Sequence, residues 1–457
     1  MEIQYTPLNK WPLLVTFFVA MMGFAACVTH KKSQATTSHS VVYISSPSAT
    51  QTQTPLDSLL NNPALKGAQV GICIAPADSG KPLFEYQSDK YFIPASNMKL
   101  FTCYAAMQYL GDSLTTFRYV DKGDGTIAIE PNGDPSFLVP DFAQQPAFQF
   151  LQLQKNILIS TNNWKDASLG AGWAWDDYTE DYMAERSAMP IYGNVVTFSY
   201  NKVIPTYFDS LVSNPYQIQS RFYSLKRGIG DNLFEKIPAT KEITDLQVPF
   251  HAHQKGLLEQ LLSDTLHVPV HVSNFSLNRL PNVQSIHSQP TDSLLKIMMH
   301  RSDNFFAEQS LLMVSNTLLG EMNDRKIIQH LLATDFAGLP QKPKWVDGSG
   351  LSRYNLVTPA DLVAVLQQMR QRFGMNRLSA ILPSANAGTL QGYYRPFAGN
   401  LLAKTGTLSN QVSISGYVTT AAGQPIVFSV LVNNHMSSAT AVRRAVESYL
   451  TTFIRSH

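Results

Sequence analysis

Residues 94–102 read PASNMKLFT and place a serine three positions before a lysine at the start of an apolar run. Positions i and i+3 share one face of a helix, so Ser96 and Lys99 are predicted to be neighbours. The apolar residues that follow have helical spacing up to Leu110, and Gly111 ends the pattern. Serine is a common helix cap, so a capped amphipathic helix explains this stretch by itself. The alternative is a nucleophile beside its base, because a buried, neutral lysine can accept the proton of a serine hydroxyl.

A second polar cluster lies in residues 298–312, MMHRSDNFFAEQSLL, between two helical patterns. Ser-Asp-Asn is an ordinary turn or helix cap in a structural interpretation. In a catalytic interpretation, Ser302 passes a proton between Lys99 and a leaving amine. Asn304 then orients Lys99 and holds a substrate amide.

A third cluster is LLAKTGTLSN, residues 401–410, where Lys404 lies among strand-like residues before a hairpin. A lysine on an edge strand discourages aggregation, which is the structural explanation. In the functional explanation Lys404 places a second cation beside Lys99 and, together with Thr405, meets a substrate carboxylate.

The same strand offers two further functional positions. Gly406 would let a substrate backbone lie close along the strand, because it has no side chain. The backbone N–H groups of Thr407 and Ser96 would form an oxyanion hole for a tetrahedral intermediate.

In chain order, Ser-x-x-Lys on a helix, Ser-x-Asn at a helix break and Lys-Thr-Gly on a strand make the three-part set of penicillin-recognising serine enzymes. The chain resembles the D-alanyl-D-alanine carboxypeptidase/endopeptidases, low-molecular-mass penicillin-binding proteins with two inserted domains. Blocks similar to that family's, in its order, are PASNMKLFT, NGDPSF, GWAWDD, SDNFFAE, DGSGLSRYNLVTP, GTL and AKTGTLSN. They span nearly the whole expected folded chain. The long interval between Ser96 and Ser302 is also similar to the family's inserted domains.

The resemblance implies an α/β (α+β) penicillin-binding, serine β-lactamase-like domain with a mainly antiparallel sheet flanked by helices. Strand patterns around residues 67–87 and 411–434, with a closing helix over 439–454, indicate a sheet assembled from distant parts of the chain. We expect residues 56–120 and 283–457 to form this domain. Residues 121–282 are rich in aromatics and short strand-like runs, and we expect one or two inserted β-rich domains there.

The resemblance also implies a mechanism. Ser96 attacks the carbonyl between two D-alanine-type residues of a peptidoglycan stem peptide or cross-link, and Lys99 is the general base. Ser302 relays the proton to the leaving amine, while Asn304 and Lys404 fix geometry and electrostatics. An acyl-enzyme forms and water releases it, and β-lactams acylate Ser96 by mimicking the terminal dipeptide.

No cofactor or metal is implied, and no His-Glu-x-x-His stretch occurs. His251 and His253 in the segment HAH are interpreted as structural. No Gly-x-Ser-x-Gly elbow is present, which disfavours a Ser-His-Asp hydrolase.

Residues 172–177, GWAWDD, are a candidate substrate subsite. In relatives with this pattern an aromatic and an acid hold the amino end of a diaminopimelate-type side chain, which suggests Trp175 with Asp176 or Asp177. A buried tryptophan beside a solvated acidic turn is the structural alternative. In DGSGLSR, Asp347, Ser349 and Arg353 could line the cleft, but a glycine-rich turn with an internal salt bridge is the preferred interpretation.

The N-terminus predicts export. Residues 11–27, WPLLVTFFVAMMGFAAC, are short for a membrane span but suit a signal sequence. Ala25-Ala26 before Cys27 resembles a bacterial lipobox, so residues 1–27 are interpreted as a signal peptide and Cys27 as a lipidation site. A plain cleaved signal or an uncleaved anchor is the alternative. Residues 28–55, rich in Ser, Thr and Gln, are interpreted as a tether that holds a periplasmic enzyme at a membrane.

Composition argues against several other classes of function. The net charge of +2 gives no broad basic field, so nucleic acid is not expected as a partner. Three cysteines are too few for a disulfide scaffold. Two further functions stay open: a β-lactamase, disfavoured because no glutamate occurs between Glu321 and Lys404, and a catalytically idle wall-binding lipoprotein.

Overall fold

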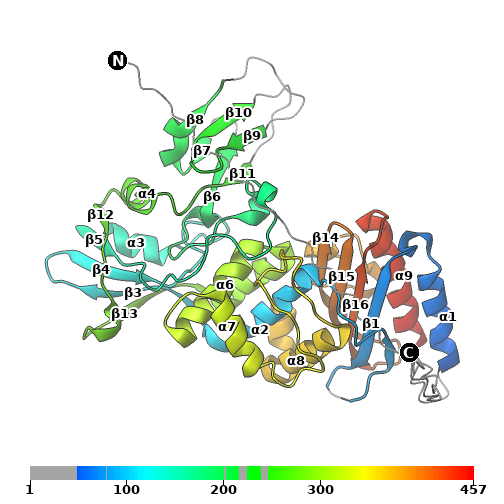
Figure 1. The fold of residues 1–457 in the computed structure, drawn as a ribbon. Coiled ribbons are helices and arrows are strands. Elements are labelled where there is room, and N and C mark those ends of the chain that lie inside the picture. Colours follow the sequence, from blue (N-terminus) through cyan, green and yellow to red (C-terminus); the bar gives the residue numbers. More distant parts are fainter. Residues whose placement is uncertain (1–48, 79, 200–201, 216–223, 238–244) are drawn as a thin grey trace, which may run out of the picture. The chain divides into compact units, whose positions relative to one another are not determined.

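The computed structural model describes residues 49–457 apart from 79, 200–201, 216–223 and 238–244 (Figure 1). The expected signal peptide, its lipidation site Cys27 and tether residues 28–48 lie outside these residues. Residues 49–55, expected to end the tether, form the first part of helix α1 (Ala49–Leu60). The other end of α1 is anchored, because Leu59 is buried in the same apolar core as the C-terminal helix α9 (Ala439–Ser456). Folded structure therefore begins before residue 56.

The central sheet joins the two ends of the described chain. Its five strands follow the order β14-β15-β16-β1-β2, and all neighbours are antiparallel. The strands are β1 (Gln69–Pro76), β2 (Phe84–Tyr86), β14 (Leu401–Leu408), β15 (Gln411–Thr419) and β16 (Pro425–Asn433). The predicted antiparallel sheet assembled from distant segments is thereby confirmed, as are the two hairpins and the closing helix.

Helices cover both faces of this sheet (Figure 1). On one face α1 and α9 enclose a core that includes Ile72, Phe428 and Phe453. On the other face lies a helical layer made of α2 (Lys99–Tyr109), α5 (Thr291–Ile297), α6 (Asn304–Leu319), α7 (Asp324–Ala333) and α8 (Pro359–Ile381). Helix α2 is buried almost throughout its length, and it packs against both α6 and α8. The predicted Ser96–Lys99 helix is therefore part of the core.

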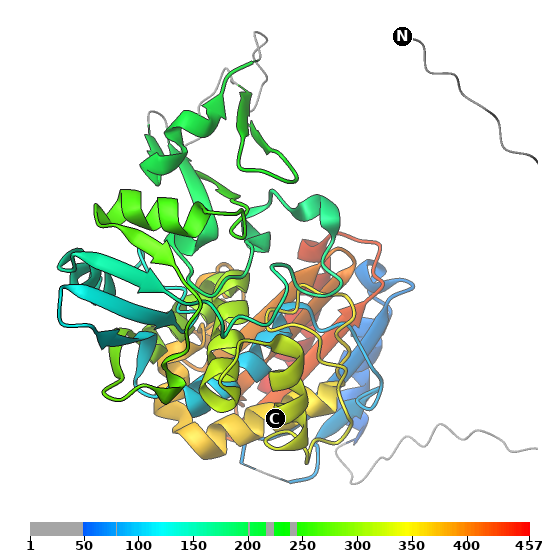
Figure 2. The same cartoon turned by 60° about the vertical axis from the view of Figure 1, so that its left-hand side comes forward.

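The chain between α2 and α5 forms separate sheets beside the helical layer (Figure 2). A five-stranded sheet has the order β12-β5-β4-β3-β13, and two three-stranded sheets have the orders β11-β6-β7 and β8-β10-β9. The larger sheet consists of β3 (Ser113–Asp121), β4 (Thr126–Pro131), β5 (Asn156–Ile159), β12 (Val270–Val272) and β13 (Gln284–Pro290). The small sheets consist of β6 (Val195–Ser199), β7 (Lys202–Ile204), β8 (Val212–Ser213), β9 (Ser224–Arg227), β10 (Phe234–Ile237) and β11 (Leu246–Pro249). Helices α3 (Pro146–Gln152) and α4 (Leu257–Leu266) accompany them.

The inserted region leaves and re-enters the helical layer at adjacent points. Strands β3 and β13 pair with each other, and Thr291 N donates to Asp112 O at 2.9 Å. The paired strands therefore begin before residue 121 and end after residue 282, so this sheet reaches beyond the limits expected for the insert.

Within the described part of the chain, no helix has the length and apolar character needed to cross a bilayer.

Candidate active site

Ser96 lies in a short 3₁₀ helix, η2 (Ala95–Met98), that runs directly into α2. The preceding Ala95 has φ +49°, in the left-handed region that L-residues rarely adopt. Two glycines make this turn possible. A Cβ on Gly350 would overlap Ala95 O, and a Cβ on Gly406 would lie 2.9 Å from Ser96 N. Strain of this kind is tolerated where the surroundings fix the backbone, as they do here.

Ser413 of strand β15 holds the same turn through two hydrogen bonds. Ser413 Oγ donates to Pro94 O at 2.7 Å, and Asn97 Nδ2 donates to Ser413 Oγ. Ser413 lies opposite Gly406 in the antiparallel register. The serine turn is thereby fixed to the sheet rather than to the helical layer alone.

Lys99 is fully buried, and its Nζ contacts three oxygen atoms. It lies 3.1 Å from Ser96 Oγ, 2.6 Å from Asn304 Oδ1 and 2.8 Å from Ser349 O. The orientation of the Asn304 amide is set by its Nδ2, which donates to Tyr182 O at 3.0 Å. Two of the three partners can only accept hydrogen bonds. A neutral Lys99 therefore directs its lone pair at the Ser96 hydroxyl.

The electrostatic setting suits a base. Burial lowers the pKa of Lys99 to about 8, and the negative charges of Asp303, Asp347 and Glu308 oppose this shift. A pKa near ambient pH is what an efficient general base requires.

Ser302 ends a π-helical turn, η8 (Met298–Ser302), with φ +63°. Asp303 then caps α6, because its side chain accepts from Phe306 N at 2.8 Å. The break between the two helices, predicted from the sequence, is where Ser302 and Asn304 reach the site. Ser302 Oγ accepts a hydrogen bond from Lys404 Nζ at 2.8 Å, so its own proton remains available to a further acceptor.

Lys404 is fully buried on β14 and also donates to Thr405 O at 2.6 Å. Burial, followed by the charges of Lys99 and Arg443, holds its pKa well below the usual range. The structure thus brings five predicted residues together from three distant segments, as two neighbouring hydrogen-bonded groups. Lys99 bonds Ser96 and Asn304, and Lys404 bonds Ser302.

The remaining β14 residues divide between the two faces of the strand. Gly406 faces the serine turn, so its missing side chain admits this chain's own backbone. Its role beside a substrate backbone stays a prediction. Thr405 and Thr407 lie on the opposite face. There Arg443 of α9 donates to Thr407 Oγ1 at 2.5 Å, and Thr405 lines a small cavity with Arg443.

A sequence model of the family described as D-Ala-D-Ala carboxypeptidase 3 (S13) matches residues 52–217 and 247–454. The chain belongs to this family.

Individual relatives are distant. The D-alanyl-D-alanine carboxypeptidase of Actinomadura sp. (strain R39) is 28% identical over 154 residues, which are 31% of this chain and 29% of that protein. The D-alanyl-D-alanine carboxypeptidase DacB of Haemophilus influenzae is 22% identical over 366 residues, 66% of this chain and 71% of that protein. The crystal structure of penicillin binding protein 4 (dacB) from Haemophilus influenzae has a TM-score of 0.70 at 19% identity, covering 88% of this chain and 99% of that one. The structural likeness shows a shared fold.

In this S13-family chain the GWAWDD segment lies beside the site, with its residues pointing different ways. Trp175 is 74% exposed, which excludes the buried tryptophan of the structural alternative. Asp176 is exposed and lines a separate pocket with Arg227. Asp177 is half-buried. Burial, followed by the charge of Asp177, raises the pKa of Tyr182. The backbone carbonyl of Tyr182 accepts from Asn304.

The DGSGLSR segment is a buried turn without the internal salt bridge we expected. Asp347 accepts from Gly350 N at 2.8 Å and from Ser352 N at 2.6 Å. Arg353 instead donates to Gln411 Oε1 at 2.7 Å, so it ties the turn to β15. The expected pair does not form because the Asp347 carboxylate is already occupied by two backbone N–H groups and by the side chains of Trp173 and Asn355.

The two histidines of HAH have protein partners. His251 Nδ1 lies 2.8 Å from Glu185 Oε1, and His253 Nε2 lies 2.7 Å from Arg186 O. Among the described residues, no three His, Cys, Asp or Glu side chains are grouped so as to hold a metal ion.

Sequence reasoning overlooked two residues behind the site. Glu308 lies one helical turn after Asn304, and its Oε1 accepts a hydrogen bond from Ser349 N at 2.7 Å. Trp173, rather than Trp175, donates from Nε1 to Asp347 Oδ2 at 2.9 Å. The spacing of Asn304 and Glu308 within SDNFFAE could have indicated the former, whereas nothing in the local sequence separates the two tryptophans.

Proposed function

We propose that this chain is a serine DD-peptidase that cleaves D-alanyl-D-amino acid bonds in peptidoglycan stem peptides and cross-links. One observation carries the proposal: Ser96 Oγ lies 3.1 Å from the Nζ of a buried lysine whose pKa is lowered to about 8. Membership of a D-Ala-D-Ala carboxypeptidase family supports the substrate class.

The acylation step is derived from the same contacts. Ser96 Oγ forms a bond to the carbonyl carbon while its proton moves to the lone pair of Lys99. The carbon–nitrogen bond then breaks, and the leaving nitrogen takes the proton of Ser302 as Lys99 restores it. Water later attacks the ester carbonyl and gives a proton to Lys99; the carbon–Oγ bond then breaks, and Lys99 returns that proton to Ser96 Oγ as the acid product leaves.

Developing charge on the carbonyl oxygen needs donors that are already in place. We assign this role to the backbone N–H groups of Ser96 and Thr407. The close approach of β14 to the serine turn at Gly406 supports the pairing, because a Cβ at that position would lie 2.9 Å from Ser96 N.

The carboxylate end of a D-alanyl-D-amino acid calls for cationic partners. We assign it to Lys404, with Thr405 next to it on the edge strand β14. Arg443 lies with Thr405 and Thr407 on the other face of this strand and adds positive charge there. An incoming carboxylate favours the protonated form of Lys404, which burial alone disfavours.

The amino end of a diaminopimelate-type side chain is assigned to Trp175 and Asp177. Asp177 is preferred to Asp176 because its charge acts on Tyr182, whose backbone carbonyl accepts from Asn304, whereas Asp176 lines a separate pocket.

We further propose that the protein is exported to the periplasm and held at a membrane through lipidated Cys27. A Cys27→Ala chain would then move from the membrane fraction to the soluble fraction, and an unchanged distribution would contradict the anchor.

Fluorescent penicillin tests the central proposal, because a β-lactam mimics the terminal dipeptide. Wild-type chain should be labelled covalently, while Ser96→Ala should fold and remain unlabelled. Mass spectrometry of soluble muropeptides after incubation then identifies the bond broken from the mass lost. A folded wild-type chain that is neither labelled nor active on muropeptides would refute the proposal, and rapid penicillin turnover would favour a β-lactamase.

A further inference from the structure

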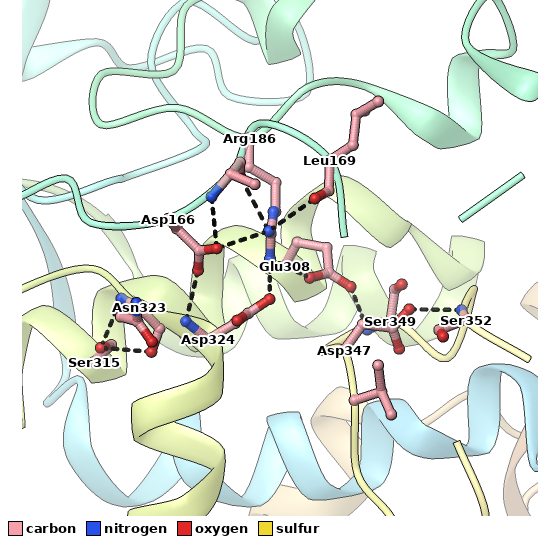
Figure 3. A network of polar contacts seen from close by, with 12 residues as sticks. Asp166, Leu169, Arg186, Glu308, Ser315, Asn323, Asp324, Asp347, Ser349 and Ser352 are labelled. Carbon is pink, nitrogen blue, oxygen red and sulfur yellow. Dashed lines mark hydrogen bonds and ion pairs between the residues drawn. The ribbon is translucent and has the colours of Figure 1, made fainter. Parts of the chain in front are cut away.

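A buried ion cluster lies next to Ser349 (Figure 3). The carbonyl oxygen of Ser349 accepts a hydrogen bond from Lys99. At its centre is the fully buried guanidinium of Arg186. Its Nη1 lies 2.7 Å from Asp324 Oδ2 and 3.3 Å from Glu308 Oε2, and its Nη2 lies 3.2 Å from Asp166 Oδ1. The carbonyl groups of Ala167 and Leu169 complete the coordination of Nη2.

Glu308 connects this cluster to the catalytic lysine through one residue. Its Oε1 accepts from Ser349 N at 2.7 Å, and Ser349 O accepts from Lys99 Nζ at 2.8 Å. The backbone of Ser349 is therefore held between Glu308 and Lys99. Because Ser349 O is one of the two acceptors that direct the Lys99 lone pair, its position decides where that lone pair points.

The inserted region also contacts the turn that contains Ser349 directly, through Trp173. Trp173 Nε1 donates to Asp347 Oδ2 at 2.9 Å, and the Arg186 guanidinium lies 5.8 Å from the Trp173 ring centroid. Asp347 also accepts from Gly350 N, so it holds the far side of the Ser349 peptide. Residues 166–186 thus reach the turn that holds Lys99 twice, directly through Trp173 and through Glu308 from Arg186.

Stability alone explains this cluster poorly. Buried ion pairs are often no more stabilising than apolar residues of similar volume, and here three carboxylates surround one cation. Burial, with the charge of Asp347, raises the pKa of Glu308 to about 7, and Arg186 opposes the rise. The charge on Glu308 therefore depends on Arg186.

We propose that Glu308, held by Arg186 of the inserted region, is a positioning residue that places Ser349 O and thereby aims and tunes Lys99. This inference rests on the proposed function, in which Lys99 is the base for Ser96. It assigns a catalytic purpose to the insert beyond covering the site.

Charges around both groups determine the expected pH dependence. Those facing Lys99 are Asp303 and Glu308 of α6, Asp347 of the turn and Lys404 of β14. Those facing Glu308 are Arg186, Asp347 and Asp324. The negative charge of Glu308 favours the protonated form of Lys99, so its removal should lower the pKa of Lys99.

The first test measures the rate of penicillin acylation against pH for the full chain. Glu308→Gln keeps an oxygen acceptor for Ser349 N but removes the charge. Its rate should rise at lower pH than that of the wild type and reach a similar plateau. Glu308→Ala removes the acceptor as well, leaves Ser349 N unpaired, and should lower the plateau by about tenfold to a hundredfold.

The second test asks whether Arg186 acts through Glu308. In Arg186→Met, Glu308 takes up a proton near neutral pH, so the acylation profile should move in the same direction as in Glu308→Gln. Combining the two changes should move it no further, since both remove the same charge. If Arg186→Met does not fold, the near-isosteric Glu308→Gln carries the test.

Arg377→Met is the matched control, because it breaks the Arg377–Asp292 ion pair, which has no link to Ser349. Its thermal stability should fall while its pH profile stays that of the wild type. Profiles of Glu308→Gln and Arg186→Met that superimpose on the wild type would overturn the inference. Failure of the wild type itself to be acylated would instead refute the proposed function.

Discussion

Lys99 and Lys404 each give up hydration to lie beside a serine hydroxyl, Lys99 at Ser96 and Lys404 at Ser302. Each burial favours the neutral amine, and each lysine discourages protonation of the other. Two such residues in one cluster are costly for folding. At the scale of single residues, therefore, the chemistry explains the structure better than stability does.

The pKa of Lys99 predicts the pH dependence of acylation. Lys99 is protonated and inactive well below about 8, and it is neutral and able to accept the Ser96 proton above that pH. The second-order rate of penicillin labelling should therefore rise through pH 8 and then level off. Stopped-flow or timed gel labelling across this range measures it, and a flat rate from weakly acidic to alkaline pH would contradict Lys99 as the base.

Gly406 gives a second prediction at this scale. In Gly406→Ala the new Cβ would lie 2.7 Å from Pro94 O and 2.9 Å from Ser96 N, so the serine turn must shift. We expect a loss of about 1–3 kcal/mol in the free energy of unfolding and about a hundredfold slower acylation. Gly338→Ala is the control, because nothing lies within 4 Å of its added Cβ. Equal labelling rates of the two variants would show that the close approach is unimportant.

At the scale of elements, the break between η8 and α6 presents two side chains to the site from one turn. Asp303 has two functions there: it caps α6, and its charge raises the pKa of Lys99. Asparagine caps helices about as well as aspartate but carries no charge.

Two substitutions should therefore separate these functions. Asp303→Asn should retain thermal stability but move the acylation profile to lower pH, because Lys99 loses a neighbouring negative charge. Asp303→Ala should move the profile in the same way and also lose about 1 kcal/mol of stability. Thermal melts with labelling at several pH values measure both effects. An unshifted profile in Asp303→Asn would show that the charge does not reach Lys99.

How much of this the sequence could predict depends on how local each signal is. Strands β1, β15 and β16 and helix α9 followed from their own periodicity, and the order of the three clusters indicated the site. Ala95 and Ser302 adopt left-handed backbone conformations, but neither is a glycine that would have predicted such a turn. Tertiary packing, which local sequence does not show, holds them in this conformation. Strand β3 pairs with β13 across the whole insert, and such long-range pairing leaves no trace in local patterns. The contact between Arg186 and Glu308 could not be predicted from the sequence for the same reason.

For the molecule as a whole, the sheet unites segments from opposite ends of the described chain, and α1 extends that union toward the N-terminus. Leu59 of α1 is only 2% exposed. Leu59→Ala should lower the free energy of unfolding by about 2–5 kcal/mol. Leu153→Ala is a matched control, since Leu153 is 83% exposed and should change little. Chemical denaturation compares the two, and a neutral Leu59→Ala would mean that α1 belongs functionally to the tether.

The stem at Asp112 and Thr291, where the insert leaves and re-enters the helical layer, has a mechanical consequence. A load pulling on the insert would enter the helical layer at this narrow stem and through the contacts made by Trp173 and Arg186. The stem ends on helices at the rim of the core. Trp173 ends on Asp347 in the turn whose carbonyl holds Lys99, and Arg186 reaches that turn through Glu308. Tension on the insert would therefore be transmitted to the position of Lys99.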